Sequence, residues 1–116
     1  MPTKHKTNAD LDQLCDRLRE VRGQKGILGY ILRGSDAASI DVKDPSKIMD
    51  YAVLSATAFE EGEHLTHTFG LGALNSAIVE GENIKVLLMT VGEHALSVFM
   101  ERTVDHHQIC QELHLA

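Results

Sequence analysis

The length, composition and charge of the chain define one small acidic domain. It has 116 residues, 43% of them hydrophobic, and a formal net charge of −6 from 11 basic and 17 acidic side chains. A chain of this length suits one domain, which can bury roughly two-thirds of its unfolded surface around a single core. The acidic balance argues against a nucleic-acid binder and against an anionic membrane surface as partner, because both call for a basic face.

Two cysteines, Cys15 and Cys110, do not make the recurring pattern of a secreted disulfide scaffold. The N-terminal segment lacks the apolar run of a signal peptide, and the longest apolar stretch is too short to span a bilayer. We therefore expect a cytoplasmic protein that has free thiols. We further expect a flexible N-terminal arm at residues 1–7 and a single domain at residues 8–116.

The first predicted element is a helix that begins after Thr7 and Asp10, which fit a capping pattern, and ends at Gly23. Its apolar residues recur in steps of three and four, which places them on one face. They are Leu11, Leu14, Cys15, Leu18 and Val21. A hairpin of two antiparallel strands is predicted next, at residues 27–33 and 39–42, because residues 34–36 read Gly-Ser-Asp, a turn sequence.

The second predicted helix begins with Asp44 as N-cap and Pro45 as its first residue, and ends at Gly62. Its apolar residues cover most of the circumference instead of forming one stripe. Such a helix must be buried on more than one side, which a domain of this size has difficulty doing alone. A partner molecule is the natural second cover. An acidic cluster, Glu60, Glu61 and Glu63, lies at the predicted end of this helix and is a modest candidate for contact with a basic partner.

After a loop at residues 64–72, three strands are predicted at residues 74–79, 84–91 and 94–102, separated by glycine-containing turns. The middle strand is apolar at consecutive positions, so both of its faces should be covered. A final helix is predicted to begin at Thr103. The order is α-β-β-α-β-β-β-α, which indicates an α+β domain: a five-stranded antiparallel sheet with helices on both faces.

This order of elements resembles the Roadblock/dynein light chain family over about residues 8–115. The stretch VLLMTVGEHALSVFMERTVDHHQICQEL is similar to the closing hairpin and helix of that family, and GILGYILRGSDAASI is similar to its first hairpin. The resemblance implies a profilin-like Roadblock fold. It also implies homodimers, or heterodimers with a paralogous Roadblock chain, formed through the second helix and the adjacent edge strand.

The resemblance further implies a scaffold or regulator of small Ras-like GTPases, or an adaptor for a dynein motor or signalling partner, without catalytic residues or cofactors. The two-sided second helix agrees with this and is inferred from the residues alone. The residues that we expect at the dimer or partner interface are Ile48, Met49, Tyr51, Ala52, Val53, Ser55, Ala56, Phe59 and Leu74.

Two alternative functions remain open from the residues. A small-ligand sensor of profilin-like or PAS-like architecture would need an apolar cavity. A metal-binding protein could use His106, Cys110 and His114, which recur every four residues on the last helix, although surface histidines around a core cysteine are the ordinary interpretation. His64 and His67 are interpreted as surface residues of a loop, and the glycine-rich stretch at residues 70–75 is interpreted as a turn.

Overall fold

The computed structural model describes the backbone of residues 2–35 and 37–113 and the side chains from residue 11 onward within those ranges. The predicted order of elements is confirmed, with one short 3-10 turn added before the second helix. The elements are α1 (Pro2–Arg22), β1 (Ile27–Arg33), β2 (Ala38–Val42), η1 (Pro45–Lys47), α2 (Ile48–Thr68), β3 (Ser76–Glu80), β4 (Ile84–Val91), β5 (His94–Glu101) and α3 (His106–Leu113).

The five strands form one antiparallel sheet in the order β2-β1-β5-β4-β3, so β2 and β3 are its edges. A register shift in β1 coincides with Gly29, whose φ is 152°. A Cβ at this position would lie 2.5 Å from the carbonyl oxygen of Asp41 in β2. Only glycine therefore allows β1 and β2 to approach this closely at the shift.

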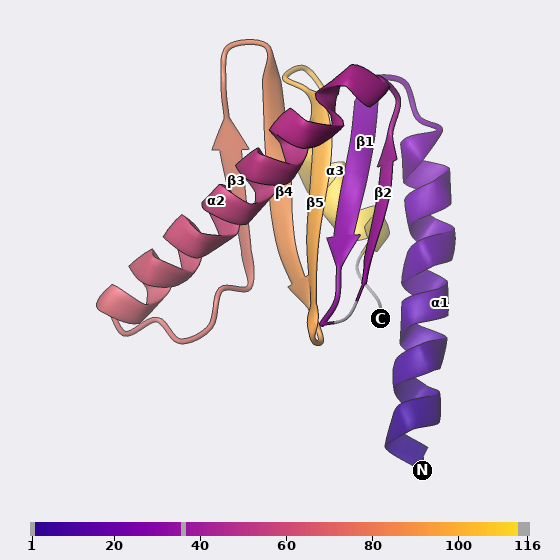
Figure 1. Cartoon of the computed structure of the whole chain (residues 1–116), viewed down its shortest axis with the longest axis vertical. Coiled ribbons are helices and arrows are strands. Elements are labelled where there is room, and N and C mark those ends of the chain that lie inside the picture. Colours follow the sequence, from indigo (N-terminus) through magenta and orange to yellow (C-terminus); the bar gives the residue numbers. More distant parts are fainter. Residues whose placement is uncertain (1, 36, 114–116) are drawn as a thin grey trace.

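Helices α1 and α3 cover one face of the sheet (Figure 1). The predicted stripe of α1 is confirmed, since Leu14, Leu18 and Val21 are almost completely buried against strands β1, β4 and β5. The two helices are also tied together by hydrogen bonds to Glu112: its carbonyl oxygen accepts from Arg17 at 3.1 Å, and its carboxylate accepts from Gln24 at 2.8 Å.

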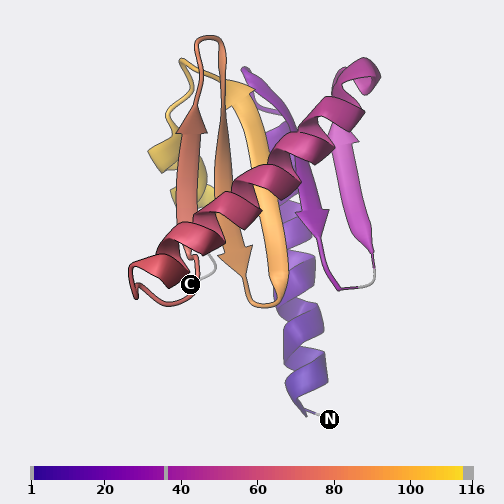
Figure 2. The same cartoon turned by 60° about the vertical axis from the view of Figure 1, so that its left-hand side comes forward.

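Helix α2 crosses the opposite face of the sheet diagonally (Figure 2). The Tyr51 ring stacks on Phe99 of β5, with centroids 4.4 Å apart and planes 9° from parallel. One helical turn later, the buried hydroxyl of Ser55 lies 2.5 Å from that of Ser97 in β5. These contacts position α2 over the middle of the sheet.

The predicted end of the second helix is wrong, because α2 continues through Gly62 to Thr68. Gly62 serves a different purpose: a Cβ there would lie 2.9 Å from Cδ2 of Leu74, a buried residue of the following loop. The glycine therefore makes room for Leu74. As a result, the loop predicted at residues 64–72 is shorter, and β3 begins at Ser76 instead of Leu74.

Three other predicted boundaries differ. The backbone is already helical at Pro2, so the first helix does not begin after Asp10; the flexibility of the arm at residues 1–7 stays a prediction. Asp105, not Thr103, caps α3, since its carboxylate accepts hydrogen bonds from the amides of His107 at 3.0 Å and Gln108 at 3.4 Å. Strand β2 starts one residue early and β5 ends one residue early, which is ordinary fraying.

Candidate protein-interaction surface

The second half of α2 extends beyond the sheet. Tyr51, Ser55 and Phe59, spaced by four residues, lie buried on the side of α2 that faces the strands. Continuing the same face in helical steps leads to Leu65 and Phe69, yet these side chains are 56% and 71% exposed. The reason is visible in Figures 1 and 2, where the C-terminal part of α2 passes beyond the edge strand β3.

Apolar residues next to this overhang are exposed as well. Leu71, in the loop that follows α2, is 72% exposed, and Ile78 and Val79 of the edge strand β3 are 38% and 44% exposed. We call Leu65, Phe69, Leu71 and Val79 the overhang patch; Ile78 lies opposite Leu87 in the ladder and is therefore on the other face of the sheet. Exposed apolar residues at a free sheet edge are typical of a surface that another protein covers.

The outer face of α2, turned away from the sheet, differs from the overhang patch. Met49 and Val53, four residues apart, are 77% and 63% exposed, and Ala56 continues the same row. Further along this face, the carboxylates of Glu60 and Glu63 are exposed. Because α2 extends to Thr68, these carboxylates lie in the helix body, where the helix dipole disfavours them less than at a helix end. The outer α2 face is thus apolar in its first half and acidic in its second.

The predicted interface residues divide into three groups according to their exposure. Tyr51, Ser55, Phe59 and Leu74 are buried inside the domain, whereas Met49, Val53 and Ala56 are exposed on the outer α2 face. Ile48 and Ala52 are half-buried against the core beneath α2. The overhang patch was missed because the helix was predicted to end at Gly62; the steps of three and four residues leading to Leu65 and Phe69 were the available signal.

The histidines of α3 make an intramolecular contact. His106 Nδ1 lies 2.9 Å from the Nζ of Lys85, a strand residue that is only 5% exposed. Burial, followed by the charge of Lys85, lowers the pKa of His106. Because an ammonium can only donate, Nδ1 accepts the hydrogen bond and His106 is neutral in this arrangement.

The other members of the predicted metal group do not gather around His106. Cys110 is half-buried against the core under α1 and α3, and His114 lies outside the described residues. His64 and His67 are exposed on α2, not in a loop. Within residues 2–35 and 37–113, no group of three or more His, Cys, Asp or Glu residues is placed to hold a metal ion.

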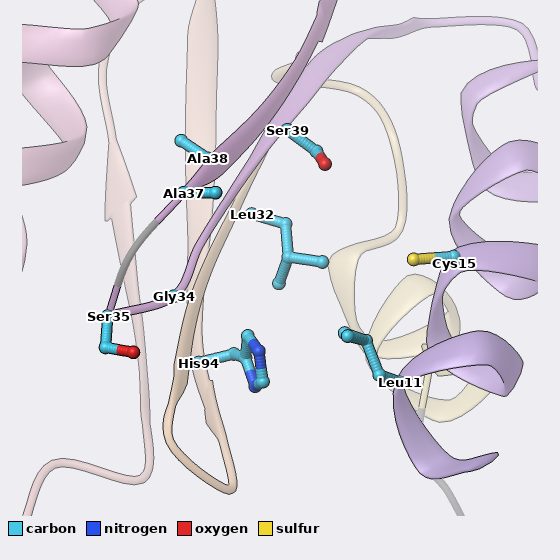
Figure 3. A pocket seen from close by; sticks show the side chains of 9 residues that line it. All are labelled: Leu11, Cys15, Leu32, Gly34, Ser35, Ala37, Ala38, Ser39 and His94. Carbon is cyan, nitrogen blue, oxygen red and sulfur yellow. The ribbon is translucent and has the colours of Figure 1, made fainter. Parts of the chain in front are cut away.

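A cavity of about 270 Å³ lies between α1 and the β1–β2 turn (Figure 3). Leu11 and Cys15 of α1 project towards it from one side, and Leu32 and the ring of His94 face them from the sheet. Its volume is slightly below the roughly 300–1,000 Å³ typical of ligand pockets. Its wall at the β1–β2 turn is exposed, so it differs from the enclosed apolar cavity expected of a small-ligand sensor.

Solved structures identify the fold as the Roadblock/LC7 fold. The Roadblock/LC7 domain from Streptomyces avermitilis superposes with a TM-score of 0.67 at 17% identity, covering 87% of this chain and 85% of that one. The gliding protein MglB from Thermus thermophilus gives 0.67 at 16%, covering 90% and 82%. An MglB structure with a tetrameric arrangement gives 0.66 at 18%, also covering 90% and 82%.

Curated relatives define the family more narrowly. The uncharacterized protein MJ0310 of Methanocaldococcus jannaschii is 30% identical over 95 residues, which cover 79% of this chain and 83% of that protein. MJ0714 of the same organism is 28% identical over 98 residues, covering 82% and 83%. The chain belongs to the family of these archaeal proteins. No family model matches it. In the part of the chain that the structure describes, no helix has the length and apolar character needed to cross a membrane.

Proposed function

We propose that this protein is a non-catalytic dimeric scaffold or regulator that binds a small Ras-like GTPase, or another signalling or motor partner, in the cytoplasm. The observation that carries the proposal is the overhang of α2. Leu65 and Phe69 continue the sheet-facing stripe of the helix beyond β3, at 56% and 71% exposure. A second Roadblock chain is the partner that the fold favours, because its sheet can pack beneath the end of α2 that extends beyond β3.

Covering the exposed part of this surface contributes substantially to the free energy of association. Fully burying a large apolar side chain contributes about 1.5–3 kcal/mol. A two-fold axis doubles each contribution, because both copies bury the same residues. Leu65, Phe69 and Val79 from two copies together therefore offset much of the entropy that association costs, about 4–15 kcal/mol. The tetrameric arrangement of MglB supports self-association as a property compatible with this fold.

The outer α2 face is the surface that we assign to the GTPase or other partner. Met49, Val53 and Ala56 are exposed on it, and none of them belongs to the overhang patch. Exposed Glu60 and Glu63 further along the helix favour a partner that combines an apolar patch with basic side chains. In this proposal, the sheet-facing side of α2 forms the dimer interface at the overhang, and the outer α2 face binds the partner.

Self-association is tested by light scattering during size-exclusion chromatography at micromolar concentration. We expect the wild-type protein at twice the monomer mass of 12.8 kDa. The double variant Leu65→Asp/Phe69→Asp should elute as a folded monomer, because two carboxylates would be desolvated in the dimer. The matched control Met49→Asp places the same charge on the outer α2 face and should remain dimeric. A monomeric wild-type protein would refute the dimeric part of the proposal.

Partner binding is tested with immobilised wild-type protein and the Val53→Asp variant in native cell extract. We expect mass spectrometry to identify a Ras-like GTPase that the wild-type protein retains and the variant loses while staying dimeric. The interaction is then repeated with the purified GTPase loaded with GDP or with a non-hydrolysable GTP analogue. If the dimer binds neither form, or Val53→Asp binds as well as the wild type, the assignment of the outer α2 face is wrong.

A further inference from the structure

Among the residues whose side chains the structure describes, Lys85 is the only charged one that is buried, at 5% exposure. It lies opposite Met100, a residue of the core beneath α1 and α3, so its side chain is on that face of the sheet. A buried ammonium ordinarily has an ionised partner, because burial without one is costly. Glu80 lies opposite Lys85 in the ladder, but its carboxylate pairs with Arg102 at 3.8 Å.

The neutral imidazole of His106 takes the place of such a partner. Its Nδ1 accepts a hydrogen bond from the Lys85 ammonium at 2.9 Å. Because His106 is the first residue of α3, this bond fastens the beginning of the helix to the sheet. The other end of α3 is held separately, through the hydrogen bonds of Glu112 to Arg17 and Gln24. The two ends of the helix thus depend on different contacts, and only the first depends on the protonation state of an imidazole.

Protonation of His106 would replace this hydrogen bond by repulsion. An imidazolium has no lone pair with which to accept, and it would face a buried ammonium at hydrogen-bond distance. The new charge would also lie in the first turn of α3, where the helix dipole disfavours cations. Burial and then the charge of Lys85 lower the pKa of His106, so the bonded state resists protonation. The contact therefore weakens as the pH falls below the ordinary pKa of histidine, about 6.5.

The charged groups that face His106 do not remove this repulsion. Glu80 of β3 and Asp105 favour its protonated form, whereas Lys85 and His107 disfavour it. Both carboxylates are already engaged, Glu80 in its ion pair and Asp105 in hydrogen bonds to helix amides. The His107 ring centroid lies 4.4 Å from that of His106, so in acid a third positive charge lies nearby. Among the described residues, the cations at this site then outnumber the carboxylates.

His106 can move away from this repulsion more easily than Lys85. Lys85 belongs to β4, which is paired on both sides, and its side chain is enclosed. His106 is half-buried and begins a helix of eight residues that follows a loop. Because helices this short are marginal without tertiary contacts, losing the bond should open the first turn and the loop before it. Val104, which packs on the core from that loop, would be uncovered as well.

We infer that the beginning of α3 is a pH-dependent element, closed on the sheet through the Lys85–His106 contact at neutral pH and released in mildly acidic solution. Release uncovers Val104 and the adjacent part of the core beneath α1 and α3, while Glu112 holds the far end of the helix. Helix α2 lies on the opposite face of the sheet (Figures 1 and 2). The inference therefore does not depend on the proposed dimer or its partner.

Amide hydrogen exchange followed by NMR at pH 7.5 and pH 5.5, corrected for the intrinsic chemical rate, tests the release. The amide of Ile109 is a suitable reporter, because it bonds to the Asp105 carbonyl at 3.3 Å across the first turn. We expect its protection to fall about tenfold at pH 5.5, the effect of losing roughly one hydrogen bond to a charged group. The amides around Ser55 in α2 should keep their protection. Equal corrected protection of Ile109 at both pH values would refute the inference.

Substitutions of the histidines separate this contact from a general effect of acid. His106→Gln keeps an acceptor for Lys85 but cannot titrate, so its Ile109 amide should stay protected at pH 5.5. His106→Arg carries a permanent charge and should lack this protection already at pH 7.5. The matched control His107→Gln leaves the Lys85 contact in place and should still lose protection in acid.

Lys85→Met removes the buried charge and keeps an unbranched apolar stem in the core, so acid should change the protection of Ile109 much less than in the wild type. A full acid response in Lys85→Met, or in His106→Gln, would mean that another group titrates, and the inference would be wrong. Circular dichroism at pH 7.5 shows whether each variant is folded. If Lys85→Met is not, the histidine variants still decide, because they change only partly or fully exposed side chains.

Discussion

The buried hydroxyl pair between α2 and β5 gives a quantitative prediction about how the helix is held. Ser55 and Ser97 are 5% and 0% exposed, and their oxygens lie 2.5 Å apart. Replacing either serine by alanine leaves the other hydroxyl buried without this partner, which costs about 1–3 kcal/mol. For Ser55→Ala, the higher helix propensity of alanine returns about 0.5 kcal/mol.

The double variant Ser55→Ala/Ser97→Ala should behave differently from the sum of its parts. Replacing both partners by apolar groups removes the unsatisfied hydroxyl, so we expect stability within about 0.5 kcal/mol of the wild type. The interaction energy in the double-mutant cycle should therefore be at least about 1 kcal/mol. A single substitution should lower the melting temperature by several degrees, while the double substitution should leave it almost unchanged.

Urea unfolding followed by circular dichroism at one fixed protein concentration measures these differences. The concentration must be fixed because self-association adds to the apparent stability. If the two single substitutions each cost less than about 0.3 kcal/mol, or if the double variant loses the sum of both, the hydroxyls do not depend on each other and the reasoning is refuted.

Other perturbations have equally definite outcomes. Because burial and Lys85 lower the pKa of His106, the folded state binds a proton less readily than the unfolded state, so stability should fall as pH decreases below about 6.5. Urea unfolding between pH 7.5 and pH 5 should show a steeper loss for the wild type than for His106→Leu; parallel curves would contradict this. Gly29→Ala should be strongly destabilising, by about 2 kcal/mol or more, since its Cβ would meet backbone at 2.5 Å. Gly72→Ala, which has positive φ but meets nothing within 4 Å, should cost only about 1–2 kcal/mol by the same unfolding assay; equal losses would show that crowding at Gly29 is unimportant.

The sequence predicts the architecture well because its periodicities are strong. The apolar stripe that includes Leu14 and Val21 predicts a helix that is buried on one face. The consecutive apolar residues of β4 predict a strand that is covered on both faces. Both predictions are confirmed. The boundaries are less predictable. Gly62 resembles a helix stop in sequence, but its role depends on Leu74, which approaches only in the folded chain.

The candidate surface is harder to predict than the fold. An apolar helix indicates a need for cover, but the sequence cannot distinguish Tyr51, which the domain's own sheet buries, from Met49, which it leaves exposed. That distinction depends on the angle at which α2 crosses the strands. The overhang likewise arises because the helix is longer than the sheet is wide, a comparison between two elements that no local pattern contains.

We expect the last turns of α2 to become more ordered when the protein dimerises. Short helices without tertiary contacts are marginal in water, and the C-terminal end of α2, which finishes at Thr68, extends beyond the edge strand β3 of the sheet that supports the rest of the helix (Figure 1). In an isolated chain, this segment should exchange its amide hydrogens faster than the turn around Ser55. Raising the protein concentration should slow that exchange selectively, because a second sheet would then lie beneath it. The amide exchange rate at the C-terminal end of α2 therefore measures the fraction of the protein that is dimeric.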